Sequence, residues 1–148
     1  MSYSPAGSFA GDVSAVEAFE ALSSEPEALL IDVRTKAEWA YVGLPDLSAI
    51  GKEILLVEWQ SYPAMAVNTD FADVLAAELQ RRGVERETAL FFLCRSGVRS
   101  LAAAKAMAAE GFDRCFNITG GFEGPMDEQR HRGEVDGWKA AGLPWVQS

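Results

Sequence analysis

Four short, mostly apolar runs alternate with segments of helical periodicity along this 148-residue chain. The runs cover residues 28–33, 54–57, 89–93 and 114–118, and their side chains do not alternate between apolar and polar. A strand of this kind is covered on both faces, which is typical of a parallel sheet flanked by helices. The pattern therefore predicts an α/β fold with a small parallel sheet of about five strands and helices on both faces.

The segments between the runs carry helix signals. Ser14 and Glu17 have the spacing of a capping box, so we expect the first helix to begin there. Asn68 or Thr69 is expected to cap a later helix, and the alanine-rich residues 100–110 predict another. The apolar face of the helix after Thr69 is expected to contain Phe71, Val74, Leu75 and Leu79.

Length and composition favour one domain. The chain is 49% hydrophobic, enough for a single core, so we expect one domain over residues 1–148 with residues 1–11 as a loosely ordered arm. The net charge of -9 argues against nucleic acid or an anionic membrane surface as a partner. The start of the sequence resembles no signal peptide and no run is long enough to span a membrane, so a cytoplasmic protein is expected.

The segment with the clearest chemical signal is residues 94–100, Cys-Arg-Ser-Gly-Val-Arg-Ser. It lies between the apolar run 89–93 and the last predicted helix, at the carboxyl end of a parallel strand, where ligands bind in such sheets. Arg95 and Arg99 place two positive charges beside Cys94. Both these charges and the N-terminus of the following helix are expected to stabilise a thiolate relative to a thiol. We therefore expect Cys94 to be a nucleophile beneath a set of backbone N–H groups that can bind an anion.

The number of residues between Cys94 and Arg99 indicates which anion the loop binds. Four residues separate Cys94 from Arg99, whereas cysteine phosphatases place one more residue between the two. The tighter ring suits a single sulfur atom bound to the cysteine better than a tetrahedral phosphoryl group. A phosphatase or an arsenate reductase is the less favoured interpretation of the same loop.

Four motifs in the same order resemble those of the single-domain rhodaneses, and the resemblance extends over most of the chain. One departure is residues 42–45, Val-Gly-Leu-Pro, where that family commonly has Gly-His-Ile-Pro. The motifs are residues 30–34 (Leu-Ile-Asp-Val-Arg) with Glu38 and Trp39, the loop 94–100, residues 117–121 (Asn-Ile-Thr-Gly-Gly) and residues 141–145 (Ala-Gly-Leu-Pro-Trp).

The resemblance implies a sulfurtransferase that works through a persulfide on Cys94. The Cys94 thiolate attacks the outer sulfur of thiosulfate or a related donor, and a thiol or cyanide then accepts the sulfur. A sulfur-relay protein is a further partner, and neither a metal nor an organic cofactor is required. In the family, Asp32 and Arg34 support the loops. The residues expected to bind the donor and the persulfide are Arg95, Ser96, Gly97, Val98, Arg99 and Ser100.

Two questions stay open at this point. Arg95 and Arg99 either contact the substrate or pair with acidic residues such as Asp32 or Glu38, and Arg99 is the favoured substrate contact. The alternative function is a carrier or regulatory module of the same fold, which receives sulfur from a partner protein. The second cysteine, Cys115, lies in an apolar strand without a neighbouring cation and is expected to be an inert free thiol.

Overall fold

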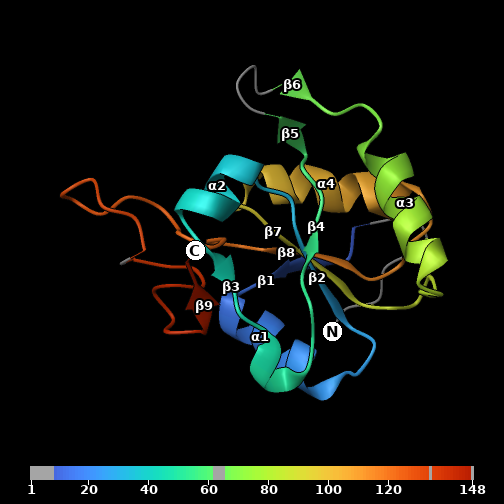
Figure 1. The fold of residues 1–148 in the computed structure, drawn as a ribbon, viewed down its shortest axis with the longest axis horizontal. Helices are drawn as coiled ribbons and strands as arrows, with labels where there is room; N and C mark the ends of the chain where they lie inside the picture. The colour runs from blue at the N-terminus through green and yellow to red at the C-terminus, as the bar shows by residue number, and fades with distance from the viewer. Residues whose placement is uncertain (1–8, 62–65, 134, 148) are drawn as a thin grey trace.

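The computed structural model describes residues 9–61, 66–133 and 135–147. Its centre is a five-stranded sheet in the order β1-β8-β7-β2-β4, and every neighbouring pair in it is parallel. Parallel neighbours need long crossover connections, which the helices provide (Figure 1). The strands are β1 (Gly11–Val13), β2 (Leu29–Asp32), β4 (Leu55–Leu56), β7 (Leu90–Leu93) and β8 (Cys115–Ile118).

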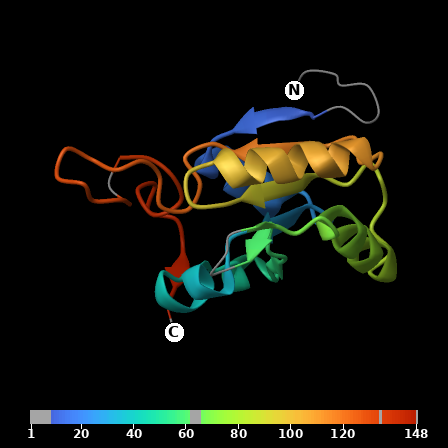
Figure 2. The ribbon, with the colours of Figure 1, turned by 90° about the horizontal axis from the view of Figure 1, so that it is seen from above.

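Helices cover the sheet on both faces, as predicted. Figure 1 shows α1 on one side of the sheet and α4 on the other. Figure 2 shows α4 running along the sheet, while the chain after β8 extends beyond it. The α/β fold class expected from the sequence is thereby confirmed. The helices are α1 (Ala15–Ser24), α2 (Lys36–Tyr41), the 3-10 helix η1 (Ser48–Ile50), α3 (Phe71–Arg81) and α4 (Val98–Ala109).

Two small antiparallel pairs stand outside the main sheet, and neither was expected from the sequence. Strand β3 (Leu44–Pro45) pairs with β9 (Trp145–Val146), and β5 (Gln60–Ser61) pairs with β6 (Ala66–Val67). Gly43 makes the first pair possible: its φ is 114°, and a Cβ there would lie 2.6 Å from the Val146 carbonyl oxygen. The end of the chain is therefore held beside α2 by two-residue strands.

The helix ends agree with the sequence signals in part. Ser14 and Glu17 form the predicted capping box at the start of α1. The predicted caps of α3 were wrong, because Asp70 precedes its first residue and makes no side-chain capping bond. Helix α4 begins at Val98, two residues before the expected start, because Gly97 takes the left-handed conformation with φ 108° that admits an earlier turn.

The core has one half on each face of the sheet. On one face, Leu75 and Leu79 of α3 and Ala104 of α4 pack on the central strands. On the other, Ala18 of α1 and Trp138 of the tail pack on the opposite sides of the same strands. The predicted face of α3 is right except at Val74, whose side chain is 48% exposed. Val74 lies beside the buried positions on the helix but beyond the reach of the sheet.

The predicted N-terminal arm needs a correction at its end. Gly11 is the first residue of β1 and pairs with Phe116, and the Ala10 amide donates to the Cys115 carbonyl at 3.0 Å. These residues are ordered because the edge of β8 offers backbone partners to the chain before α1. Residues 1–8 of the predicted arm lie outside the described residues.

The sheet places the loop 94–100 at its centre. Strand β7 has β2 on one side and β8 on the other, and Leu93 at its end is in register with Asp32. The residue after Leu93 therefore emerges between two neighbouring strand ends rather than at an exposed edge. Within the part of the chain that the structure describes, no helix has the length and apolar character needed to cross a membrane.

Two adjacent residues of α3 test this division between core and surface. We expect Leu75→Ala to lower the free energy of unfolding by about 2–5 kcal/mol, because the fully buried side chain leaves a cavity between α3 and the sheet. Val74→Ala, one position earlier, should change it by less than about 0.5 kcal/mol. Urea unfolding of both variants measures the difference. Equal losses would contradict the assigned orientation of the helix.

Candidate active site

Cys94 follows β7 directly, and its residue is only 1% exposed. Among the described residues, two hydrogen-bonding groups contact its sulfur. The Gly97 backbone N–H donates to Sγ at 3.1 Å, and the Ser100 hydroxyl oxygen lies 3.2 Å from Sγ. The sulfur is thus held at the start of α4, with partners from the loop and from the first turn of the helix.

The loop that follows this sulfur carries several backbone N–H groups without an acceptor among the described residues. Within the described residues, the amides of Arg95, Ser96, Val98, Arg99 and Ser100 make no hydrogen bond to a backbone or side-chain acceptor. Those at the start of α4 are the unpaired donors of every helix N-terminus, and no side chain caps them. The arrangement supplies a group of dipoles that favour negative charge near the sulfur.

The segment after β8 supports the loop from behind. The Phe122 amide donates to the Cys94 carbonyl at 2.8 Å, and the Gly124 amide donates to the Arg95 carbonyl at 3.0 Å. Gly121 allows this contact, because a Cβ there would lie 2.5 Å from the Cys94 carbonyl oxygen. The carbonyls of the loop are therefore engaged on one side, and its N–H groups are left on the other.

Arg99 is paired with Glu38 in α2. Two hydrogen bonds of 2.7 and 2.9 Å join the guanidinium to the carboxylate, and both side chains are mostly buried. Burial raises the pKa of Glu38, but the hydrogen bond and charge of Arg99 outweigh it and hold that pKa below its usual value. The same hydrogen bond raises the pKa of Arg99. This is one of the pairings that the sequence left open.

A pocket of about 380 Å³ opens above the sulfur. Arg95 at its mouth is exposed, and its side chain has no hydrogen-bond or ion-pair partner among the described residues. Gln60 of β5 closes another side of the pocket. The structure thus brings every predicted binding residue to Cys94: Arg95, Ser96, Val98 and Arg99 line the pocket with it, and Gly97 and Ser100 contact its sulfur.

Asp32 and Arg34 form a fully buried ion pair at the end of β2. The Arg34 Nη2 lies 2.6 Å from the Asp32 Oδ2 and also donates to the Gly43 carbonyl at 2.7 Å. The guanidinium stacks on Phe122 at 4.4 Å from the ring centroid. Because the Phe122 amide binds the Cys94 carbonyl, this pair lies directly behind the loop. Their predicted role as loop supports is compatible with this placement and stays a prediction.

Asn117 is a site residue that sequence reasoning missed. Its Oδ1 accepts a hydrogen bond from the Ser100 hydroxyl at 2.5 Å, and its Nδ2 donates to the Asp12 carboxylate at 3.1 Å. A polar amide at a buried position of an otherwise apolar strand was the available signal. Asp12 left no signal, because it is an exposed residue of the unpredicted strand β1.

Cys115 differs from Cys94 in its surroundings. It lies fully buried in β8 within the apolar core, and its only hydrogen-bond partner among the described groups is the Phe112 carbonyl at 3.5 Å. Burial, with a smaller contribution from the charge of Asp113, raises the pKa of Cys115 to about 12. A thiol with that pKa stays protonated and unreactive under ordinary conditions.

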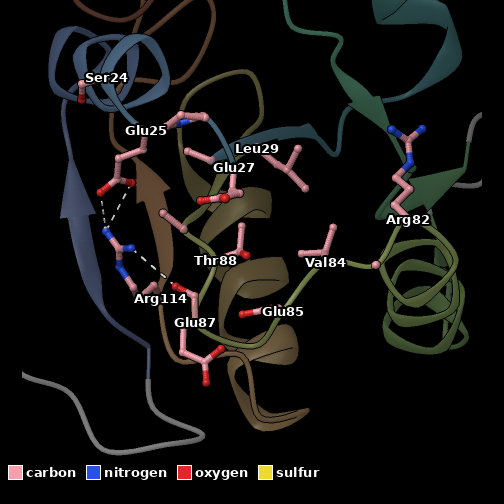
Figure 3. A pocket seen from close by; sticks show the side chains of 14 residues that line it. Ser24, Glu25, Glu27, Leu29, Arg82, Val84, Glu85, Glu87, Thr88 and Arg114 are labelled. Carbon is pink, nitrogen blue, oxygen red and sulfur yellow. Dashed lines mark hydrogen bonds and ion pairs between the residues drawn. The ribbon is translucent and has the colours of Figure 1, made fainter.

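Figure 3 shows another pocket, of about 650 Å³, at the amino-terminal ends of the central strands. Arg114 pairs there with Glu25 at 3.0 Å, and Glu27, Glu85 and Glu87 carry further negative charge. Its described lining residues include neither cysteine nor histidine. The described residues also hold no cluster of three or more histidine, cysteine, aspartate or glutamate side chains that could bind a metal ion.

Comparison with known proteins identifies related chains. The family model described as the STR4 middle domain matches residues 10–148. The uncharacterized protein RC0915 of Rickettsia conorii is 37% identical over 134 residues, which are 90% of this chain and 95% of that protein. The rhodanese-like domain-containing protein 4 of Arabidopsis thaliana is 26% identical over 138 residues, 93% of this chain but only 26% of that longer protein.

Solved structures show the same architecture. The crystal structure of Rv0390 from M. tuberculosis superposes with a TM-score of 0.83 at 45% identity, covering 95% of this chain and all of the other. The polysulfide-sulfur transferase of Wolinella succinogenes gives a TM-score of 0.57 at 22% identity, covering 92% of this chain and 77% of the other. The second likeness concerns the fold alone, and it agrees with the α/β fold described above.

The two cysteines are expected to differ in reactivity. At about pH 9, iodoacetamide should alkylate Cys94 in the folded protein and leave Cys115 unmodified, since Cys115 ionises only near pH 12. Peptide mass mapping measures the modification at each cysteine. Unfolding in urea should make both react and serves as the control. Rapid labelling of Cys115 in the folded protein would contradict its assignment as an inert buried thiol.

The buried pair behind the loop is expected to matter for stability. Asp32→Ala should lower the free energy of unfolding by about 3 kcal/mol or more, because it leaves the buried Arg34 charge without its partner. Glu25→Ala removes a carboxylate from a partly exposed pair with Arg114 and should lower it by less than about 1 kcal/mol. Urea denaturation measures the free energy of unfolding of both variants. A loss in Asp32→Ala as small as that in Glu25→Ala would contradict a stabilising role for the Asp32–Arg34 pair.

Proposed function

The chain belongs to the family described as the STR4 middle domain, and from that premise we propose that it is a sulfurtransferase carrying a sulfane sulfur as a persulfide on Cys94. One observation carries the proposal. A buried cysteine sulfur lies at a helix N-terminus, within a loop whose N–H groups have no other acceptor among the described residues. Such a setting suits a sulfur atom that carries negative charge, as the outer sulfur of a persulfide does.

The first half of the reaction loads the cysteine. After the thiol proton is lost to solvent, the Cys94 thiolate attacks the outer sulfur of thiosulfate or a related donor. A bond forms between the two sulfurs, the S–S bond of the donor breaks, and sulfite leaves with its electron pair. The negative charge then rests on the outer sulfur of the persulfide, where the loop N–H groups can stabilise it.

The second half unloads it. A nucleophilic acceptor, cyanide or a thiolate, bonds to the outer sulfur, and the electron pair of the persulfide S–S bond returns to Cys94. Cyanide leaves as thiocyanate and the free thiolate is regenerated. The negative charges balance in both halves, so the cycle requires no metal, redox cofactor or proton donor.

The two arginines differ in what they offer a donor. Exposed Arg95 is free to attract an anionic donor to the pocket mouth. The charge of Arg99 is largely balanced by Glu38, but Arg99 still lines the pocket. We therefore assign recruitment to Arg95, and assign to Arg99 a short-range contact that also holds α2 against the loop.

A carrier that receives sulfur from a protein partner is the second candidate. The observations that favour it are the small pocket and the neutralised Arg99, which together make a weaker site for a free dianion than two unpaired arginines would. In this variant of the proposal, the donor is a protein persulfide.

Intact-mass spectrometry tests the covalent intermediate. Treatment with thiosulfate or polysulfide should add one sulfur, about 32 Da, and cyanide should remove it again. Cys94→Ala should abolish the addition, whereas Cys115→Ala should retain it because that thiol is buried and protonated. Sulfur that still binds to the Cys94→Ala protein, or no addition with either donor, would contradict the proposal.

Turnover separates the enzyme from the carrier. Rapid formation of thiocyanate from thiosulfate and cyanide supports the enzyme. Loading by polysulfide with slow turnover on thiosulfate supports the carrier. Hydrolysis of a phosphoryl ester that is lost in Cys94→Ser would instead favour the phosphatase interpretation and overturn both.

A further inference from the structure

A chain of three side-chain contacts connects the buried sulfur to the surface of the edge strand. It runs from Cys94 to the Ser100 hydroxyl at 3.2 Å, then to the Asn117 amide at 2.5 Å, and ends at the carboxylate of Asp12 at 3.1 Å. Cys94, Ser100 and Asn117 are all almost completely buried, whereas Asp12 is exposed. The mechanism above uses none of the last three residues beyond the Ser100 amide.

The donor and the acceptor of each hydrogen bond in this chain of contacts can be assigned by starting at the Asp12 carboxylate. An ionised carboxylate only accepts hydrogen bonds, so Asp12 requires the NH₂ group of the Asn117 amide. The oxygen of that amide then faces Ser100, and because a carbonyl oxygen cannot donate, the Ser100 hydroxyl must donate to it. The single hydroxyl hydrogen is thereby committed away from the sulfur.

We propose that Asp12 is a positioning residue for the sulfur site: through Asn117 it turns the hydroxyl hydrogen of Ser100 away from the reactive sulfur. The oxygen lone pairs of Ser100 face Cys94, so the 3.2 Å contact is a hydrogen bond that only the thiol can donate. A thiolate loses this bond and faces the lone pairs instead. Ser100 therefore offers the sulfur a hydrogen-bond acceptor, while the Gly97 N–H offers it a donor.

The effect of Asp12 on the sulfur can be separated from that of the charged residues in the pocket. Three charged side chains line the Cys94 pocket among the described residues. They are Glu38 from α2, Arg95 from the loop and Arg99 from α4. None of them contacts Asn117 or Asp12 through a recorded hydrogen bond or ion pair among the described residues. A change at Asp12 therefore leaves the pocket lining as it is.

Asp12→Asn tests the proposal with an almost isosteric change at an exposed position. An asparagine can donate or accept, so it no longer dictates the orientation of the Asn117 amide, and Ser100 becomes free to donate to a Cys94 thiolate. We expect the alkylation of Cys94 by iodoacetamide to become about tenfold faster on the low-pH side of its pH profile, and the profile to move to lower pH. Asp12→Ala should move it in the same direction.

Loss of a negative charge also favours a thiolate, and the matched control is the same change in a Ser100→Ala background. Without the hydroxyl there is nothing to reorient, so Asp12→Asn should then alter the rate less than about twofold. An equal acceleration in both backgrounds would assign the effect to charge alone and overturn the proposal. Unchanged alkylation after Asp12→Asn and Asp12→Ala in the parent protein would overturn it as well.

This inference concerns the resting thiol, and only its bearing on catalysis rests on the proposed function. Alkylation needs no sulfur donor, so the two ideas can fail separately. A shifted profile with no persulfide on the parent protein would retain the positioning role and reject the sulfurtransferase. A persulfide with unshifted profiles would do the reverse.

Discussion

The close approach of Gly121 to the loop after β7 is the contact on which the sulfur site depends. A side chain there would overlap the Cys94 carbonyl, so only glycine lets the chain after β8 pass behind the loop. The amides of Phe122 and Gly124 then occupy the Cys94 and Arg95 carbonyls. With these acceptors used, the N–H groups at the start of α4 stay unpaired among the described residues, and that of Gly97 donates to the sulfur. The anion site that we propose therefore depends on two adjacent strand ends.

Among the described residues, the arginines around the loop are either paired with carboxylates or exposed to solvent. Buried cations require carboxylate partners, and Arg34 and Arg99 take theirs from Asp32 and Glu38. Arg95 keeps a free charge at the cost of being exposed, where solvent screens it. The unpaired N–H groups at the start of α4 add positive potential that these ion pairs do not cancel, and we expect them to suit one small anionic atom better than a bulky dianion.

The sequence predicted those parts of the fold that depend on local signals. Apolar runs indicated the central strands, and the loop around Cys94 carried its chemistry in consecutive residues. Strand β1 was not predicted, because Gly11 and its neighbours form a strand by pairing with β8, which lies far along the chain. Val74 was misassigned because helical periodicity does not show how wide the contact with the sheet is. The partners of Arg99 and Asn117 likewise come from distant segments, so spacing alone could not choose them.

The orientation that we propose for the Ser100 hydroxyl favours the persulfide form of Cys94 over the unloaded thiolate. In the empty thiolate the negative charge rests on Sγ, opposite the lone pairs of Ser100 and beside a single N–H, that of Gly97. In the proposed persulfide the charge moves to the outer sulfur, one bond farther from the Ser100 hydroxyl. We therefore expect the Ser100 contact to disfavour the unloaded anion more than the loaded one. Under the proposed function, such a site holds its sulfur until an acceptor arrives, which both a carrier and a two-step transferase need.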